Sequence, residues 1–230
     1  MTTLPFAFPA QPQSVLPLTD GSAGVPVNRI FCVGRNYAAH AVEMGHDPDR
    51  EPPFFFLKPR EAVLTEGRMP YPPATEDLHH EVELVAILGE GGRDIPVTTA
   101  LDHVFGYAIG LDMTRRDRQG EAKKAGRPWE VGKAFEASMP CGPVHPASAI
   151  GHPERGAITL DVDGERRQAG DLDQMIWSLP EVIANLSTLF ALKAGDCIMT
   201  GTPAGVGPVR RGQTMVAAID GLGSLEVTVV

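Results

Sequence analysis

The sequence predicts a β-rich α+β domain with a few short helices. Several short apolar runs have the length of strands and are separated by turn-forming residues. Residues 178–190 instead show a clear amphipathic helical pattern. Neither an internal repeat nor a linker divides residues 28–230, so we expect a single domain there. Residues 1–27, rich in Pro, Gly and Ser, are expected to form an extended N-terminal arm.

The first half of the chain alternates strands with two short helices. Its expected elements are a strand at 29–33, a helix at 37–44, strands at 54–57, 81–88 and 104–111, and a polar helix at 114–124. Gly45 ends the first helix, and Gly126 followed by Pro128 ends the second.

The second half is mostly β-structure around one helix. The dipeptide Asp163-Gly164 predicts a hairpin turn. Ser178 is placed to cap the amphipathic helix, and Glu181 three residues later completes the pattern of a capping box. The expected strands lie at 157–162, 165–168, 196–199, 214–219 and 224–230.

The acidic composition argues against two classes of partner. A formal net charge of −9 is unfavourable for a general nucleic-acid or membrane-surface binder. No apolar run approaches the length of a membrane span, and no basic segment precedes an apolar stretch at the start, so we expect a cytoplasmic protein. The three cysteines form no C-x-x-C pair and indicate neither a disulfide framework nor a zinc motif.

One segment runs against this acidic balance. Residues 115–127 contain six basic and two acidic side chains. A helix with a solvated face would have this composition. A local positive rim that attracts an anionic substrate would have it as well, and the sequence leaves both interpretations open.

Three acidic residues in or beside strongly apolar stretches are candidate metal ligands. Glu81 and Glu83 precede or interrupt an apolar run, and Asp112 ends another. Glu81 and Glu83 are two residues apart, so their side chains leave the same face of a strand. A solvent-facing edge with alternating Glu is the alternative, which Asp112 weakens. Buried carboxylates need a compensating charge, and an all-oxygen ligand set indicates Mg²⁺, Ca²⁺ or Mn²⁺.

His40 and Glu43 lie three residues apart on the helix expected at 37–44, so they are neighbours on one helical face. A carboxylate beside an imidazole fixes its tautomer and stabilises the imidazolium ion, which produces a general base. A His–Glu contact at the surface, without catalytic role, is the alternative.

Further polar residues are placed to contact a group bound at Asp112. Arg116 and Gln119 lie at i, i+3 on the following helix, and Lys133 stands in a stretch of small and apolar residues. The glycine-rich segment 201–207 lacks the spacing and the following helix of a phosphate loop. It is more typical of a rigid loop that presents Thr202 and backbone N–H groups to a carboxylate. Taken singly, each side chain could also be an ordinary exposed residue.

Taken together, these segments resemble the fumarylacetoacetate hydrolase family from about residue 29 to the C-terminus. The matching motifs, in order, are Val33-Gly34-Arg35-Asn36-Tyr37 with His40 and Glu43, Phe54-Phe55-Phe56-Leu57-Lys58-Pro59, His80-Glu81-Val82-Glu83-Leu84, Gly110-Leu111-Asp112-Met113-Thr114, Arg116-Asp117 with Gln119, Pro128-Trp129, Lys133, Gly195-Asp196 and Thr200-Gly201-Thr202-Pro203. The chain is similar to the short branch of the family, which contains fumarylpyruvate and acylpyruvate hydrolases, oxaloacetate decarboxylases and hydroxymuconate isomerases.

The resemblance implies a β-rich mixed-sheet roll that forms a homodimer and takes a small 2-oxo acid as substrate. It implies Mg²⁺, or else Mn²⁺ or Ca²⁺, bound by Glu81, Glu83 and Asp112. It implies catalytic roles for His40, Glu43, Lys133 and Gln119, and substrate-binding roles for Arg35, Arg116 and Thr202.

The stretch 45–53 is most similar to fumarylpyruvate hydrolases of aromatic degradation. We therefore expect hydrolysis of a carbon–carbon bond in a 2,4-diketo acid, an acylpyruvate such as fumarylpyruvate, to give pyruvate and a carboxylic acid. The alternative is an oxaloacetate decarboxylase or a 2-hydroxymuconate-type keto–enol isomerase that uses the same metal-stabilised enolate. A non-catalytic metal-binding protein is a third hypothesis, against which His40, Glu43 and Lys133 argue.

Overall fold

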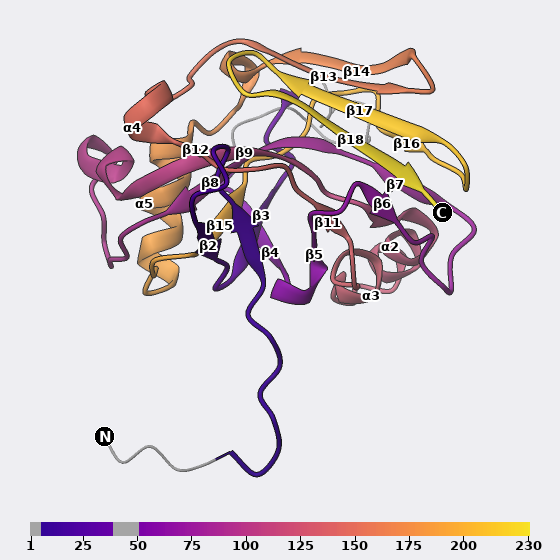
Figure 1. The fold of residues 1–230 in the computed structure, drawn as a ribbon, viewed down its shortest axis with the longest axis horizontal. Coiled ribbons are helices and arrows are strands. Elements are labelled where there is room, and N and C mark those ends of the chain that lie inside the picture. The colour runs from indigo at the N-terminus through magenta and orange to yellow at the C-terminus, as the bar shows by residue number, and fades with distance from the viewer. Residues whose placement is uncertain (1–5, 39–50) are drawn as a thin grey trace.

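Two β-sheets face each other across the main hydrophobic core in a computed structural model that describes residues 6–38 and 51–230 (Figure 1). The sheets are mixed and the helices are short. This architecture confirms the β-rich α+β roll expected from the sequence.

The larger sheet carries the candidate metal ligands. Its strands, in spatial order, are β12 (His145–Pro146), β9 (Val104–Leu111), β8 (Val82–Leu88), β15 (Cys197–Met199), β3 (Ile30–Gly34) and β4 (Phe54–Lys58). Strand β15 runs parallel to β3, and the other neighbours are antiparallel.

The second sheet has five strands and includes the predicted hairpin. Its order is β14 (Glu165–Asp171), β13 (Ala157–Val162), β17 (Thr214–Ile219), β18 (Gly223–Val229) and β6 (Arg68–Met69). Asp163 and Gly164 both have positive φ angles in the turn between β13 and β14, as the Asp-Gly signal predicts.

Short strands and helices connect and cover the two sheets. The remaining strands are β1 (Val15–Pro17) with β2 (Gly24–Pro26), β10 (Thr114–Arg115) with β7 (Leu78–His80) and β16 (Gly207–Pro208), and β11 (Met139–Pro140) with β5 (Val63–Leu64). The helices with bounds inside the described ranges are η1 (Arg60–Ala62), η2 (Val97–His103), α2 (Arg116–Lys124), α3 (Glu130–Lys133), α4 (Ala147–Ile150), η3 (Leu172–Gln174) and α5 (Leu179–Leu189).

Strand β8 is buried on both faces, and the alternation of its side chains defines two cores. Leu84, Ala86 and Leu88 pack toward the five-stranded sheet. Val85 and Ile87 pack on the opposite face in a smaller cluster with Leu16, Val27, Met139 and the three free cysteines. The even and odd positions of this strand therefore face different environments.

The structure differs from the predicted elements at two places beside the candidate ligands. The polar helix was expected from residue 114, but Thr114 and Arg115 pair with β7, so α2 starts at Arg116. Glu81 lies between β7 and β8 and was expected inside a single strand. Helix α5 has the predicted capping box between Ser178 and Glu181.

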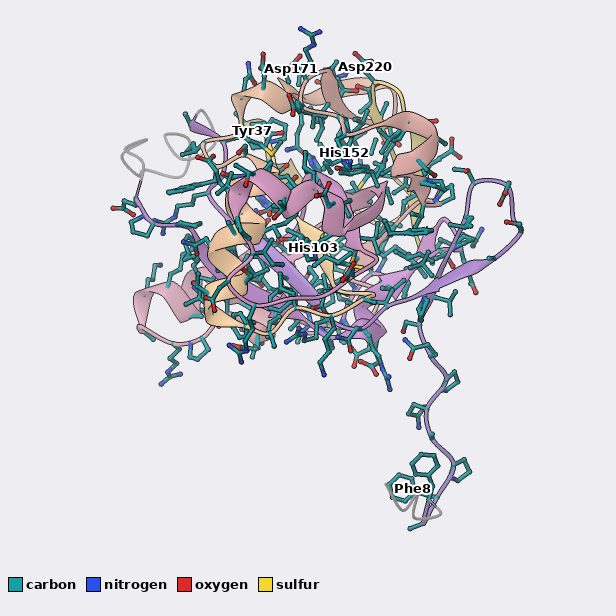
Figure 2. The ribbon with its side chains drawn as sticks, turned by 90° about the vertical axis from the view of Figure 1, so that its left-hand side faces the viewer. Phe8, Tyr37, His103, His152, Asp171 and Asp220 are labelled. Carbon is teal, nitrogen blue, oxygen red and sulfur yellow. The ribbon has the colours of Figure 1, made fainter. Side chains whose placement is uncertain are left out.

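The N-terminal segment is more structured than an extended arm. Residues 15–26 form the β1–β2 hairpin, whose Leu16 is fully buried, and Leu18 forms a bridge with Val144. Residues 6–14 do extend away from the body of the molecule (Figure 1), with Phe8 near the tip of the arm (Figure 2). Within the described ranges, no helix has both the length and the apolar character to cross a membrane.

Candidate functional site

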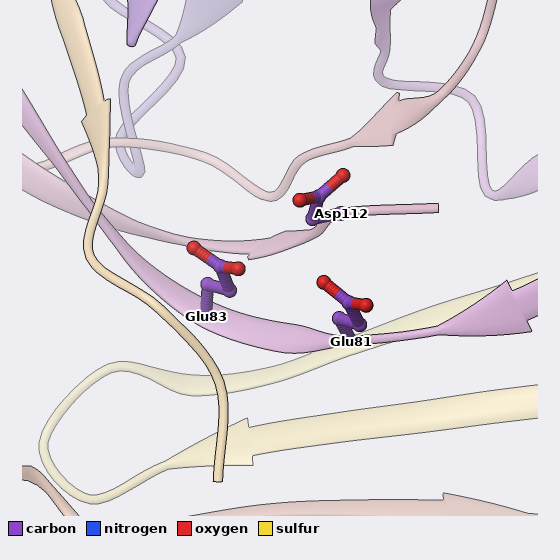
Figure 3. Close-up of side chains that lie close together, drawn as sticks. All are labelled: Glu81, Glu83 and Asp112. Carbon is purple, nitrogen blue, oxygen red and sulfur yellow. The ribbon is translucent and has the colours of Figure 1, made fainter. Parts of the chain in front are cut away.

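The three candidate ligands project from the same face of the six-stranded sheet (Figure 3). Glu83 has the same parity as Val85 on β8, so it lies on the side of the smaller core. Asp112 follows β9 directly, and its backbone N–H donates to the carbonyl of Glu81 at 2.8 Å. One oxygen from each carboxylate lies within 4.8 Å of the others, and all three residues are buried.

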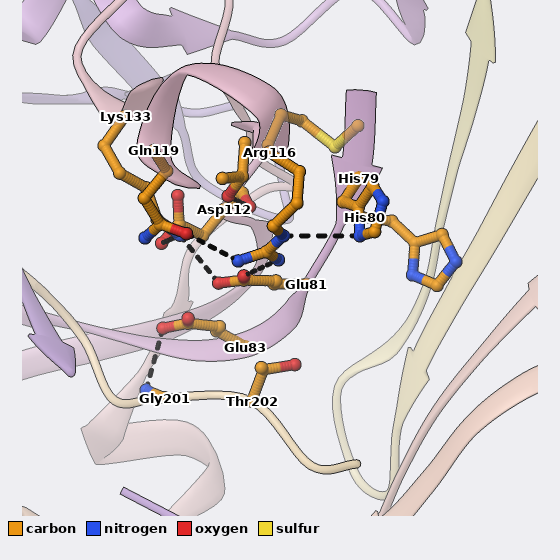
Figure 4. A network of polar contacts seen from close by, with 12 residues as sticks. His79, His80, Glu81, Glu83, Asp112, Arg116, Gln119, Lys133, Gly201 and Thr202 are labelled. Carbon is orange, nitrogen blue, oxygen red and sulfur yellow. Dashed lines mark hydrogen bonds and ion pairs between the residues drawn. The ribbon is translucent and has the colours of Figure 1, made fainter. Parts of the chain in front are cut away.

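Cationic side chains contact this carboxylate cluster (Figure 4). The ammonium of Lys133, at the end of α3, donates to Glu81 Oε2 at 2.8 Å and to Asp112 Oδ2 at 2.7 Å. Burial by itself would lower the pKa of Lys133, but the carboxylates of Asp112 and Glu81 outweigh it and raise the pKa. Lys133 is therefore a stable cation and is unsuited to act as a general base at neutral pH.

Glu83 is the least compensated of the three acids. Its Oε2 accepts a hydrogen bond from the backbone N–H of Gly201 at 2.8 Å (Figure 4). Burial raises its pKa well above the usual range, and the nearby charges of Asp112 and Glu81 raise it further. The loop at 201–207 thus presents a backbone N–H to a carboxylate as predicted, but the carboxylate belongs to the protein itself.

Lys58 supports the cluster from β4 and was not predicted as a site residue. Its Nζ lies 2.8 Å from Asp112 Oδ1, although this oxygen accepts no hydrogen bond of good geometry from the described residues. The ammonium also donates to the carbonyl of Met113 and to Ser138 Oγ. The sequence signals for this role are its position at the end of an aromatic strand and its place in the family-like motif at 54–59.

Arg116 and Gln119 lie on one face of α2 and both reach the site, as their i, i+3 spacing predicts (Figure 4). The guanidinium of Arg116 forms an ion pair with Glu81 and donates to Gln119 Oε1 at 2.7 Å. Its Nε also donates to Nδ1 of His79, whose Nε2 faces Asp77 at 2.9 Å. Burial and then the Arg116 charge lower the pKa of His79, which fits a neutral ring that accepts at Nδ1.

Thr202 faces the pocket and is held by a buried residue of the second sheet, Gln168. Gln168 Nε2 donates to Thr202 Oγ1 at 2.8 Å and to the carbonyl of Pro203. Its Oε1 accepts from the backbone N–H of Val82 at 3.1 Å and lies 3.0 Å from His80 Nδ1. Gln168 thus connects the Thr202 loop to the strand that follows Glu81, a role that its place in a hairpin did not suggest.

Arg35 lines the same pocket as Glu81 and Lys133. It follows Gly34, where a Cβ atom would lie only 2.0 Å from the ring of Phe54, so glycine is required for this ring to pack there. Arg35 has a left-handed backbone with φ of 58°, and its guanidinium carbon lies 5.2 Å from the centroid of the Phe54 ring.

Lys123 also lines this pocket and was not singled out in the sequence. The signal was its spacing, seven residues after Arg116 and four after Gln119. His40 and Glu43, the predicted general-base pair, lie outside the described residues.

The carboxylate cluster fits a hard divalent cation. Its donors are oxygens only, they converge from the adjoining ends of β8 and β9, and their burial makes an uncompensated negative charge unfavourable. Glu83 in particular has a raised pKa that a bound cation would lower. The chemistry of the site therefore supports a divalent metal held by Glu81, Glu83 and Asp112.

Residues 29–230 match the family described as fumarylacetoacetate (FAA) hydrolase C-terminal. The chain belongs to this family. The resemblance drawn from the sequence motifs is thereby confirmed, and the match begins close to the end of the N-terminal segment.

Members of the family with different named activities are similar to this chain. The crystal structure of fumarylpyruvate hydrolase from Pseudomonas aeruginosa in complex with Mn²⁺ and pyruvate is 53% identical, with a TM-score of 0.96 over 98% of this chain and 99% of that one. A mitochondrial oxaloacetate tautomerase of Arabidopsis thaliana is 44% identical over 87% of this chain and 90% of its own length. A mitochondrial oxaloacetate decarboxylase of Dictyostelium discoideum is 43% identical over 84% and 89%. The protein is therefore an enzyme of this family.

Proposed function

We propose that the protein hydrolyses a carbon–carbon bond in a 2,4-diketo acid, with fumarylpyruvate as the preferred acylpyruvate, to give pyruvate and a carboxylic acid. The observation that carries this proposal is the pocket itself, in which a buried carboxylate cluster faces several cationic and polar side chains. The similarity to the Pseudomonas fumarylpyruvate hydrolase, solved with Mn²⁺ and pyruvate, supports it.

Mg²⁺ is the proposed metal, with Mn²⁺ or Ca²⁺ as alternatives, bound by Glu81, Glu83 and Asp112. When bound, the divalent ion supplies Lewis-acid stabilisation of the negative charge that develops at the pyruvoyl end. Lys133 has three ammonium hydrogens, two of which point to Glu81 and Asp112. We assign the third to the 4-keto oxygen, where it stabilises the oxyanion formed by attack of water.

His40, oriented by Glu43, is proposed to take a proton from the attacking water. The water oxygen bonds to the 4-keto carbon, the bond between carbons 3 and 4 breaks, and its electron pair moves into the pyruvate enolate. The proton then returns to carbon 3, which yields pyruvate and the second acid. Gln119 is proposed to orient the water or the diketo group.

Arg116, Arg35 and Thr202 are proposed to bind the substrate carboxylates. Thr202 Oγ1 accepts a hydrogen bond from Gln168, so its own proton is available for donation. Charge-assisted hydrogen bonds from guanidinium groups are among the strongest that a carboxylate can accept. The contacts of Arg116 and Thr202 would hold the pyruvoyl end in one orientation while the far carbon chain differs between substrates.

Oxaloacetate tautomerisation or decarboxylation is the second candidate function. It is favoured by the named activities of relatives that are 43–44% identical to this chain. These reactions, and the isomerisation of a 2-hydroxymuconate, use the same stabilised enolate but require no attacking water. The cationic pocket would serve either chemistry.

A substrate panel on one preparation separates the two candidates. Fumarylpyruvate, acetylpyruvate and oxaloacetate are compared with Mg²⁺ or Mn²⁺ present, and pyruvate release is measured by a coupled assay. We expect the highest kcat/KM with fumarylpyruvate and loss of activity with a chelator. Efficient conversion of oxaloacetate together with no cleavage of either acylpyruvate would replace our proposal with the second candidate.

We also propose that the protein acts as a homodimer in aromatic-compound catabolism. The exposed aromatic side chains of the N-terminal arm, Phe6 and Phe8, support an assembly in which a second copy covers them. Light scattering of the intact chain, compared with a chain that begins at residue 11, tests whether the arm contributes to a dimer.

A further inference from the structure

Helix α2 presents a stripe of three polar side chains to the pocket. Arg116, Gln119 and Lys123 follow one another at i, i+3 and i+7, the spacing of one helical face, and all three line the pocket that contains Glu81 and Glu83. With a rise of about 1.5 Å per residue, the Cα atom of Lys123 lies roughly 10 Å further along the helix than that of Arg116. The stripe therefore leads from the metal ligands toward the other end of the pocket.

Two aromatic rings hold two cations at this far end. The Nζ atom of Lys123 lies 5.0 Å from the ring centroid of Trp129, and Arg35 stacks in the same way on Phe54. The rings of Trp129 and Phe54 contact each other edge to face, with centroids 5.4 Å apart. Because cations are attracted to aromatic faces, this ring pair fixes both positive groups in one wall of the pocket.

The cationic side chains of the site fall into two groups. Lys58, Lys133 and Arg116 form ion pairs with the carboxylates of Asp112 and Glu81. Lys123 and Arg35, in contrast, form no ion pair with any residue in the described parts of the chain. Burial, and next the charges of Arg116 and Arg35, lower the pKa of Lys123 to about 8. The protonated form of Lys123 is therefore stabilised when an anion binds beside it.

We propose that Lys123, together with Arg35, binds the distal carboxylate of the substrate and thereby selects 2-oxo acids that carry a carboxylate at both ends. The inference rests on the proposed function, because the pyruvoyl carboxylate must first occupy the metal end. Fumarylpyruvate ends in a second carboxylate, whereas acetylpyruvate ends in a methyl group. Lys123 is thus a specificity-determining residue for the length and charge of the acyl group.

Both interpretations of the basic segment 115–127 apply, but to different residues. Lys124 and Arg127 are exposed and do not line the site pocket. These two residues form the solvated face. Arg116 and Lys123 point into the pocket and form the positive rim. This division provides a matched control, since Lys123 and Lys124 are neighbours of identical chemistry on different sides of the helix.

Steady-state kinetics of Lys123→Met with fumarylpyruvate and acetylpyruvate tests the proposal. Methionine keeps an unbranched stem against Trp129 and removes the charge. We expect the KM for fumarylpyruvate to rise roughly 10- to 100-fold, the usual effect of losing a charge-assisted hydrogen bond. The KM for acetylpyruvate and both kcat values should stay within about twofold of the wild type. Lys123→Arg should retain most of the preference, and Lys124→Met should match the wild type with both substrates.

Binding of the two products gives a readout that needs no turnover. By calorimetry, Lys123→Met should bind fumarate at least about tenfold more weakly and bind pyruvate as the wild type does. Equal losses for both substrates or both products, or no loss for either, would overturn the proposal. If the proposed function itself is wrong, the wild-type protein will cleave neither acylpyruvate. That result is distinct from the outcomes that would overturn the role of Lys123.

Discussion

The ammonium nitrogen of Lys58 lies 2.8 Å from Oδ1 of Asp112, and both side chains are almost fully buried. This pair connects β4 to the end of β9, at the point where Asp112, the last of the three proposed metal ligands, leaves the sheet. A charge in this position has lost its contact with water and depends on its partner. The ligand geometry at Asp112 therefore depends on a residue that would itself bind neither metal nor substrate.

Removal of Lys58 should destabilise the metal-free protein. Lys58→Met leaves the carboxylate of Asp112 with one cation fewer and leaves the acceptors at Met113 and Ser138 without their donor. We expect the free energy of unfolding to fall by about 3–5 kcal/mol, measured by urea denaturation in the presence of a chelator. Lys193→Met, at an exposed position, should have almost no effect. A loss of less than about 1 kcal/mol for Lys58→Met would contradict the assigned role.

Glu83→Gln should separate metal binding from folding. The amide keeps the shape of the side chain and can still accept the hydrogen bond from Gly201, but the ligand charge is lost. We expect Mn²⁺ affinity by calorimetry to fall by roughly 100-fold or more, with a parallel loss of activity. Because burial makes the charged form of Glu83 unfavourable, the thermal midpoint of the metal-free variant should not decrease. Glu90→Gln, exposed just beyond β8, is the control, and equal metal affinity in both variants would exclude Glu83 as a ligand.

The KM for a dianionic substrate should depend on pH through Lys123. The pKa of its ammonium is lowered to about 8, first by burial and then by Arg116 and Arg35, while Lys133 adds to this effect and Glu81 opposes it. A bound carboxylate favours the protonated form. The affinity for the dianionic substrate is therefore highest below pH 8, where Lys123 is protonated. Above pH 8 it declines by up to about tenfold per pH unit.

A pH series of KM values from 6.5 to 9.5 measures this dependence. Acetylpyruvate, which lacks the distal carboxylate, should show no such increase between pH 8 and 9. The Lys123→Met variant should lose the increase for fumarylpyruvate. If that variant retained the wild-type pH profile, the titrating group would have to be another residue.

His40→Ala should abolish hydrolysis and leave metal binding intact. General-base catalysis contributes roughly 10²- to 10⁴-fold to a rate, so kcat for fumarylpyruvate should fall by that amount. Mn²⁺ affinity should match the wild type, because the predicted ligands are Glu81, Glu83 and Asp112. Hydrolysis at the normal rate by this variant would remove the His40–Glu43 pair from the mechanism.

The elements and acids with strong local signals were predictable from the sequence. The strand at 104–111 has the predicted bounds, because an uncharged run ends abruptly at Asp112. The capping box of α5 and the Asp-Gly hairpin turn also depend only on residues that are close in sequence. The convergence of Glu81, Glu83 and Asp112 followed from strand parity and from the high free energy of an unpaired buried charge.

Features that depend on distant partners were not predictable in the same way. The β1–β2 hairpin is anchored by Val144, more than a hundred residues away, and its Pro- and Gly-rich sequence gives no periodic signal. Lys58 resembles the polar end of an aromatic strand, and only the fold brings it to Asp112. Lys123 lies in a segment rich in basic residues. Only the packing of the helix in the fold shows that Lys123 points into the pocket and that Lys124 does not.

Gln168 belongs to the five-stranded sheet, yet its amide contacts both Thr202 and the backbone of Val82 in the other half of the roll. A small rotation of one sheet against the other would therefore shift the hydroxyl of Thr202 relative to the metal ligands. Substitutions in the outer strands, remote from any reacting atom, can retune which acids the enzyme accepts. This coupling ties the packing of the two sheets to the position of a hydroxyl that is proposed to bind the substrate.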